Sequence, residues 1–181
     1  MGFEIAISYK EILIRVLLAT LIGLIFGVER ERSHKPAGVR THILVCLAAC
    51  VIAIISIYGF VYAFPHGPAN VNVNADPARL VTGVLTGIGF LGAGIIWKSP
   101  NGSVQGITTA AEVFMLAALG IACGLGMYFL AGLGAVIAFI TMLADSIYRQ
   151  SKRSRFKKQS PEGPGSDSAQ SADREYEEHL H

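Results

Sequence analysis

The feature that most constrains this chain is a series of apolar runs, each about long enough to cross a membrane. A helix needs about 20 mostly apolar residues to span the hydrocarbon core of a bilayer. Such runs alternate with short polar segments, and the expected spans are residues 12–28, 41–62, 78–97, 107–123 and 127–148. The sequence therefore predicts an all-α integral membrane protein, built as a bundle of five transmembrane helices.

The composition supports this class and divides the chain in two. Hydrophobic residues make up 52% of the sequence and charged residues only 15%, whereas a soluble domain carries about a quarter charged residues. Many of the charges fall in residues 149–181, which are first basic and then rich in Ser, Gly, Pro and Glu. We expect a transmembrane domain at 1–148 and a tail at 149–181 that is disordered beyond Phe156.

The distribution of Lys and Arg predicts the orientation. These residues gather in 29–40 and 149–158, with Lys98 between two spans, whereas Lys10 and Arg79 lie at the opposite ends of the predicted helices. The positive-inside rule then places the amino terminus outside and the carboxyl-terminal tail in the cytoplasm. The basic run at 149–158 either rests on anionic lipid headgroups or is a plain stop-transfer flank.

Glycines are dense in the third predicted span and recur at helical spacing elsewhere. Residues 87–92 match the pattern G-x-G-x-x-G, but they lie inside a hydrophobic span, so a nucleotide site is not expected. The better interpretation is small-xxx-small packing between helices, within the chain or in a homo-oligomer such as a dimer. An alternative is a broken helix whose carbonyls line a polar site. The glycines assigned to helix packing are Gly83, Gly87, Gly89, Gly92, Gly94, Gly120 and Gly124.

Glu112 is the most telling polar residue of the predicted spans. It lies five residues after Ile107, about 8 Å inside the boundary at about 1.5 Å per residue. A carboxylate at that depth is costly. It either reaches the headgroup region as a shallow acid, or it serves as an ion ligand, a proton acceptor or the partner of a buried Arg. Thr108 and Thr109 lie one turn before it and complete a candidate ion site.

Other polar residues support structural interpretations. The alternating charges of residues 29–32 form either a solvated face or an ion pair that holds this loop to Arg40 or to the turn at 98–106. Arg15 is expected to anchor the chain at the outer membrane interface. Cys46, Cys50 and Cys123 are interpreted as core-filling residues, and a metal role for His42 with the first two cysteines is the weaker alternative.

Three blocks of the sequence resemble the MgtC/SapB family of bacterial inner-membrane proteins. They are GLIFGVER at 23–30 with PAGVRTH at 36–42, GIGFLGAG at 87–94, and GSVQGITTAA at 102–111, which continues to Gly120. The first block holds a cytoplasmic loop motif of Glu29, Arg30, Arg40 and Thr41. The chain departs from the family pattern at Phe114, where Trp is frequent, and at Glu112, where a neutral residue is common.

The resemblance implies a non-enzymatic, multi-pass protein of the bacterial inner membrane, linked to magnesium homeostasis, low-magnesium adaptation and virulence. The glycine-rich helix faces add the expectation that the protein acts by helix–helix contact with membrane complexes, and the resemblance points to the ATP synthase as an example. Some relatives carry a folded cytoplasmic domain after the last span, and regulation through such a domain is not expected here. The alternative is a transporter or channel for Mg²⁺ or another cation that uses Glu112 with Thr108 and Thr109. The expected partners are the lipid bilayer and membrane proteins; no cofactor, nucleotide or nucleic acid is expected, and which metal would bind is unknown.

Overall fold

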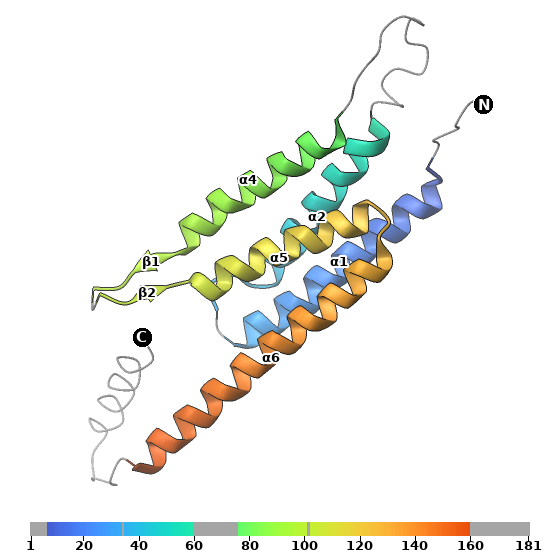
Figure 1. Ribbon diagram of the computed structural model, residues 1–181. Coiled ribbons are helices and arrows are strands. Elements are labelled where there is room, and N and C mark those ends of the chain that lie inside the picture. Colours follow the sequence, from blue (N-terminus) through green and yellow to red (C-terminus); the bar gives the residue numbers. More distant parts are fainter. Residues whose placement is uncertain (1–6, 34, 60–75, 101, 160–181) are drawn as a thin grey trace, which may run out of the picture.

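The computed structural model describes residues 7–33, 35–59, 76–100 and 102–159, with the side chains of 145–159 outside that description. The chain is a bundle of helices with one small hairpin (Figure 1). The elements are α1 (Tyr9–Arg32), α2 (Val39–Ile54) with the π-helical turn η1 (Ile55–Gly59), α4 (Pro77–Ile95), β1 (Trp97–Lys98), β2 (Val104–Gln105), α5 (Ile107–Gly124) and α6 (Tyr128–Gln159).

Four of these segments are long and apolar enough to cross a membrane: Tyr9–Arg32, Val39–Gly59, Ala78–Ile95 and Ile107–Gly124. Within the described residues, the apolar part of α6 is the shorter stretch Tyr128–Ala144. The predicted all-α membrane class is therefore confirmed. The described residues form five α-helices, of which four lie in candidate spans, where five spans were expected. The inside–outside orientation stays a prediction.

Helix boundaries follow local chemistry. Asp76 caps α4, because its side chain accepts a hydrogen bond from the backbone N–H of Ala78 at 3.0 Å, and Pro77 begins the helix as predicted. The turn between α5 and α6 is tight because Gly126 adopts φ +77°. These two signals could be read directly from the sequence.

Two segments differ from the sequence prediction. The turn at 98–106 is an antiparallel hairpin, in which Trp97 pairs with Gln105 and Lys98 with Val104. The last helix does not end near residue 148 but continues to Gln159, through the basic run that was assigned to the tail. A helix has no reason to stop there, since residues 149–159 contain neither Pro nor Gly. The expected disorder of 160–181 lies outside the described residues.

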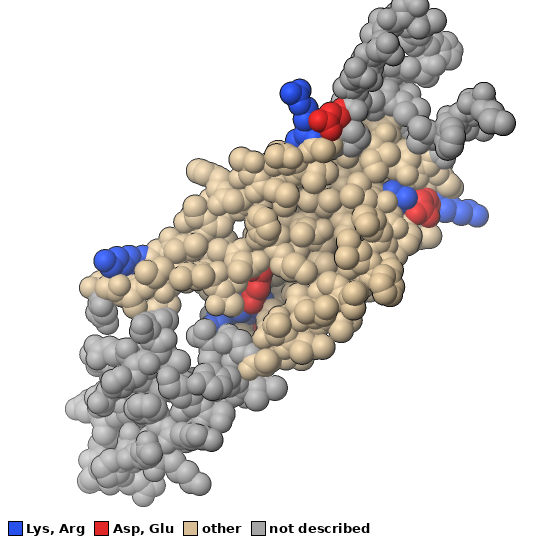
Figure 2. All heavy atoms as spheres, in the orientation of Figure 1, with Lys and Arg blue, Asp and Glu red and all other residues tan. Residues whose placement is uncertain are grey.

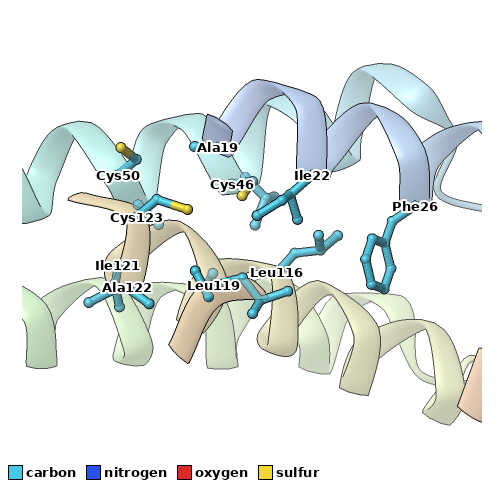
Figure 3. Packing of buried hydrophobic residues seen from close by; sticks show 14 of the residues in the cluster. Ala19, Ile22, Phe26, Cys46, Cys50, Leu116, Leu119, Ile121, Ala122 and Cys123 are labelled. Atoms are coloured by element: carbon cyan, nitrogen blue, oxygen red, sulfur yellow. The ribbon is translucent and has the colours of Figure 1, made fainter. Parts of the chain in front are cut away.

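Helix α5 is the centre of the bundle, in contact with α1, α2, α4 and α6 (Figure 1). Its side chains interleave with those of α1 and α2 in the core shown in Figure 3. Leu116 of α5 and Cys46 of α2 have no exposed surface. Phe26 of α1 meets Phe139 of α6 edge-to-face at 5.6 Å between ring centroids, which joins the last helix to the core.

Glycines bring three of the helices into close contact. A Cβ added at Gly23 of α1 would lie 2.7 Å from the Cα of Ile43, and one at Gly27 would lie 2.6 Å from the Cα of Val39. On α5, a Cβ at Gly120 would collide with the carbonyl oxygen of Cys46. Only glycine permits such approach, so α1 and α5 both press on the backbone of α2.

Candidate functional site

A buried ion pair joins the last turn of α1 to the first turns of α5. The Nε of Arg30 lies 2.6 Å from Oε2 of Glu112, and Nη2 of Arg30 donates a hydrogen bond to Oγ1 of Thr109 at 2.8 Å. The Arg30 side chain is 3% exposed and that of Glu112 is 14% exposed. Figure 2 shows basic and acidic atoms together in a hollow of the surface beside the start of α5.

The local sequence explains why these groups meet. Arg30 lies on the same face of α1 as Gly23 and Gly27, because residues seven and three positions apart share a helix face. That face packs closely on α2, so the guanidinium enters the bundle instead of reaching water. Thr109 and Glu112 are three positions apart on α5 and present their oxygens to the same guanidinium.

Two other buried polar atoms of α1 and α2 belong to this end of the bundle. His42 has no exposed surface, and its Nδ1 lies 2.9 Å from the carbonyl oxygen of Gly38, so Nδ1 is assigned as the donor. Ser33 donates a hydrogen bond to Oε1 of Glu29 at 2.8 Å. Nε2 of His42 and Oε2 of Glu29 are buried, with no hydrogen-bond partner among the described residues. The end of the bundle is therefore polar inside as well as charged.

The geometry decides what the candidate ion site can do. Magnesium takes an octahedral set of oxygen ligands and usually retains several waters. Glu112 offers its carboxylate to a guanidinium, whose positive charge opposes a cation at the same place. Within the described ranges, no group of three His, Cys, Asp or Glu side chains is placed to hold a metal ion. The arrangement can brace α1 against α5 without any bound ion.

The predicted site residues are brought together only in part. Glu112 and Thr109 meet, but Thr108 faces outward and is exposed. Of the proposed loop motif, Arg30 is buried in the pair, Glu29 is partly buried, and Arg40 and Thr41 are exposed. Arg30 thus pairs with the fourth predicted span and not with the loop or the turn at 98–106. The burial of Arg30 could have been suspected from the sequence, because Arg30 lies on the same helix face as Gly23 and Gly27.

The glycines assigned to helix packing also divide into two groups. Gly120 and Gly124 lie against α2, and a Cβ at Gly92 would be in ordinary contact with the Cβ of Ala110, at 3.6 Å. The remaining members of α4 have no described heavy atom within 4 Å of an added Cβ; they are Gly83, Gly87, Gly89 and Gly94. Among the described residues, no neighbour packs closely against these four glycines.

A second buried arginine closes the opposite end of the bundle. Nη1 of Arg15 donates a hydrogen bond to the carbonyl oxygen of Gly124 at 2.7 Å, and its guanidinium lies 5.5 Å from the ring centroid of Tyr58. Glu11 pairs with Arg15 at 3.2 Å and accepts a hydrogen bond from the hydroxyl of Tyr128. Arg15, which was expected to anchor the chain at the membrane interface, has a buried side chain that caps the carboxyl end of α5. The Glu11–Arg15 spacing of four residues was the available signal.

Comparison with known proteins places this architecture in a family. A family model described as the MgtC family matches residues 16–150, which include both partners of the Arg30–Glu112 pair. The chain belongs to the MgtC family. No solved structure matches it.

Relatives of this MgtC family member are found across bacteria. The chain is 36% identical over 148 residues to an uncharacterized protein of Haemophilus influenzae, covering 79% of this chain and 61% of the relative. It is 39% identical over 118 residues to Protein SapB of Bacillus subtilis, covering 65% and 49%. It is 38% identical over 142 residues to the putative magnesium transporter YhiD of Escherichia coli, covering 77% and 61%.

The MgtC chain spans about half to three fifths of the length of these relatives. The shared part is the helical bundle, since the matched region of the family model ends within α6. Family membership together with four apolar candidate spans identifies a multi-pass protein of the bacterial inner membrane.

Proposed function

We propose that this chain is a non-enzymatic membrane regulator of the MgtC type, which acts by helix–helix contact with a larger membrane complex such as the ATP synthase. Its proposed roles are magnesium homeostasis, adaptation to low magnesium and virulence. The observation that carries the mechanism is the open glycine face of α4.

This face follows from helix geometry. At about 100° per residue, Gly83, Gly87 and Gly94 fall within about 40° of one another around α4. Gly92 lies on the opposite side, toward Ala110 of α5. One side of α4 therefore packs within the chain. The other side presents three glycines, and an added Cβ on any of them would have no atom of the described residues within 4 Å.

The energetic argument is that these glycines are costly unless another backbone approaches them. Each glycine in a helix interior costs about 1 kcal/mol relative to Ala. Gly120 and Gly124 offset that cost by contact with α2, whereas the open face of α4 has no such contact in the described chain. A helix of a partner membrane protein would supply it by close backbone packing.

Capture of the partner from native membranes tests this proposal. Gly87→Leu fills the open face, and we expect it to abolish co-purification of the bound complex after cross-linking. Gly132→Leu is the matched control, because Gly132 lies on α6 and a Cβ added there also has no described atom within 4 Å. Equal capture by wild type, Gly87→Leu and Gly132→Leu would refute contact through α4.

A cation transporter or channel is the second candidate function. It is favoured by the name of the YhiD relative, a putative magnesium transporter, and by the hollow beside the start of α5 (Figure 2). In that case a cation must displace the Arg30 guanidinium from the Glu112 carboxylate, and Thr108 and Thr109 would line its path to that carboxylate. The residual exposure of Glu112 gives the carboxylate a route to solvent.

Flux into liposomes separates the two candidates. Purified protein that carries Mg²⁺ or another cation in wild-type form, but not as Glu112→Gln, would establish transport and overturn the pure regulator. Glu31→Gln is the control, since Glu31 is an exposed carboxylate on the neighbouring last turn of α1. The regulator proposal expects no protein-dependent flux in any of the three.

A further inference from the structure

The hairpin between α4 and α5 combines exposed apolar side chains with a lysine. We propose that this hairpin is a lipid-binding element that lies in the membrane interface, with Trp97 at the level of the headgroups. Its partner is the boundary between headgroups and acyl chains. This inference is independent of the proposed contact through α4.

The position of the hairpin in the chain is the first argument. Helix α4 ends at Ile95 and α5 begins at Ile107, and both are membrane-spanning candidates. The hairpin therefore starts and finishes at the same bilayer surface. It is also short and closed, since the backbone N–H of Ser99 donates to the carbonyl of Ser103 at 2.8 Å.

The exposed side chains are the second argument. Trp97 is 54% exposed, and three further large hydrophobic side chains of this segment are 40% to 58% exposed: Ile96, Val104 and Ile107. Water is a poor environment for such a group, whereas the aromatic belt of membrane proteins is where Trp accumulates. Lys98 follows Trp97 directly, and its charged end can reach lipid phosphates while its stem stays among apolar groups.

A close backbone contact gives the hairpin a defined depth. Gly106 has φ +89°, and a Cβ added there would collide with the carbonyl oxygen of Ile95. The start of α5 thus lies against the last residue of α4. Because the two helix ends lie in contact, the hairpin that joins them begins and ends at nearly the same depth, and Trp97 lies two residues beyond the end of α4.

The sequence contains a single Trp, so fluorescence of the full chain reports on the hairpin alone. The experiment uses phosphatidylcholine–phosphatidylglycerol vesicles whose acyl chains carry bromine either near the glycerol backbone or near the chain ends. We expect the shallow bromines to quench Trp97 strongly, the deep ones weakly, and aqueous iodide little.

A second variant provides a depth standard in the same protein. Trp97→Phe combined with Phe90→Trp moves the reporter seven residues back along α4, about 10 Å at about 1.5 Å per residue. Phe90 is 81% exposed. We expect the order of quenching to reverse, with deep bromines now more effective.

Three results would overturn the inference. Quenching of wild-type Trp97 by iodide but not by brominated lipid would place the hairpin in water. Protection from both quenchers would place it in a protein contact. Stronger quenching by deep than by shallow bromines would place Trp97 inside the hydrocarbon core. All three results are measured with the wild-type protein, so they test the inference even if the double variant does not fold.

Discussion

Removal of the Arg30 guanidinium tests directly whether the buried ion pair stabilises the bundle. Arg30→Met keeps the approximate length of the side chain and removes its charge. It leaves Glu112 partly buried without the cation 2.6 Å away and Thr109 without its donor. The expected result is a large loss of stability and a loosened contact between α1 and α5.

The magnitude follows from burial. Removal of one member of a buried ion pair typically costs about 3–5 kcal/mol, because the attraction between the two charges is lost while the other charge stays buried. Glu112 retains 14% exposure and can recover some hydration. We therefore expect Arg30→Met to lower the free energy of unfolding by about 3 kcal/mol. Arg30→Met/Glu112→Leu leaves no unpaired charge of this pair, so it should cost less than the single variant.

Equilibrium unfolding in mixed detergent micelles, followed by circular dichroism, measures these differences. The matched control is Arg32→Met, since Arg32 lies two residues further along α1 and is exposed. We expect that control to stay within about 0.5 kcal/mol of wild type. Equal effects of Arg30→Met and Arg32→Met, or a double variant less stable than Arg30→Met, would show that the pair does not brace the bundle.

Three further predictions concern packing and the opposite end of the bundle. Gly120→Ala should destabilise the protein by about 1–3 kcal/mol, because its methyl group meets the α2 backbone. Gly83→Ala on the open face should stabilise it by up to about 1 kcal/mol. If both variants shift the midpoint of thermal unfolding in the same direction, the packing of these helices is contradicted. Arg15→Met should lower the free energy of unfolding by about 1–3 kcal/mol, since it removes the donor to the carbonyl oxygen of Gly124. An unchanged free energy of unfolding in detergent would contradict the role of Arg15 as a cap of α5. The three cysteines are buried, so maleimide should label them slowly in the folded protein in micelles and fully after unfolding. Rapid labelling of the folded protein would contradict the burial of these side chains in the core.

Much of the fold was readable from local chemistry, and the exceptions have physical causes. Asp76–Pro77 and Gly126 act on their own backbone neighbours, so their effects need no knowledge of distant residues. The hairpin at 97–105 escaped prediction because its strands contain only two residues each, too few for an alternating pattern. The helical continuation of α6 was missed because the basic run was assigned to a tail on composition, although it carries no helix-breaking residue.

For the candidate site, the sequence supplied the unusual residues but not their partners. Glu112 stood out because a carboxylate is costly inside a span, and a buried Arg was one of its expected partners. The choice of Arg30 required the crossing of α1 and α5, which are 79 residues apart at the Arg30–Thr109 contact. Gly120 and Gly83 illustrate the same limit. Both occur in small-xxx-small patterns, but among the described residues Gly120 meets a neighbouring helix and Gly83 does not.

By itself, the sequence determined a membrane-embedded helical bundle, because apolar length and backbone hydrogen bonding leave a span few alternatives. Tertiary structure decided how the costly residues are used. It paired Arg30 with Glu112, placed Arg15 over the end of α5, and left one face of α4 open. Those outcomes depend on which helix faces meet, and apolar periodicity does not specify the neighbour that each face will contact.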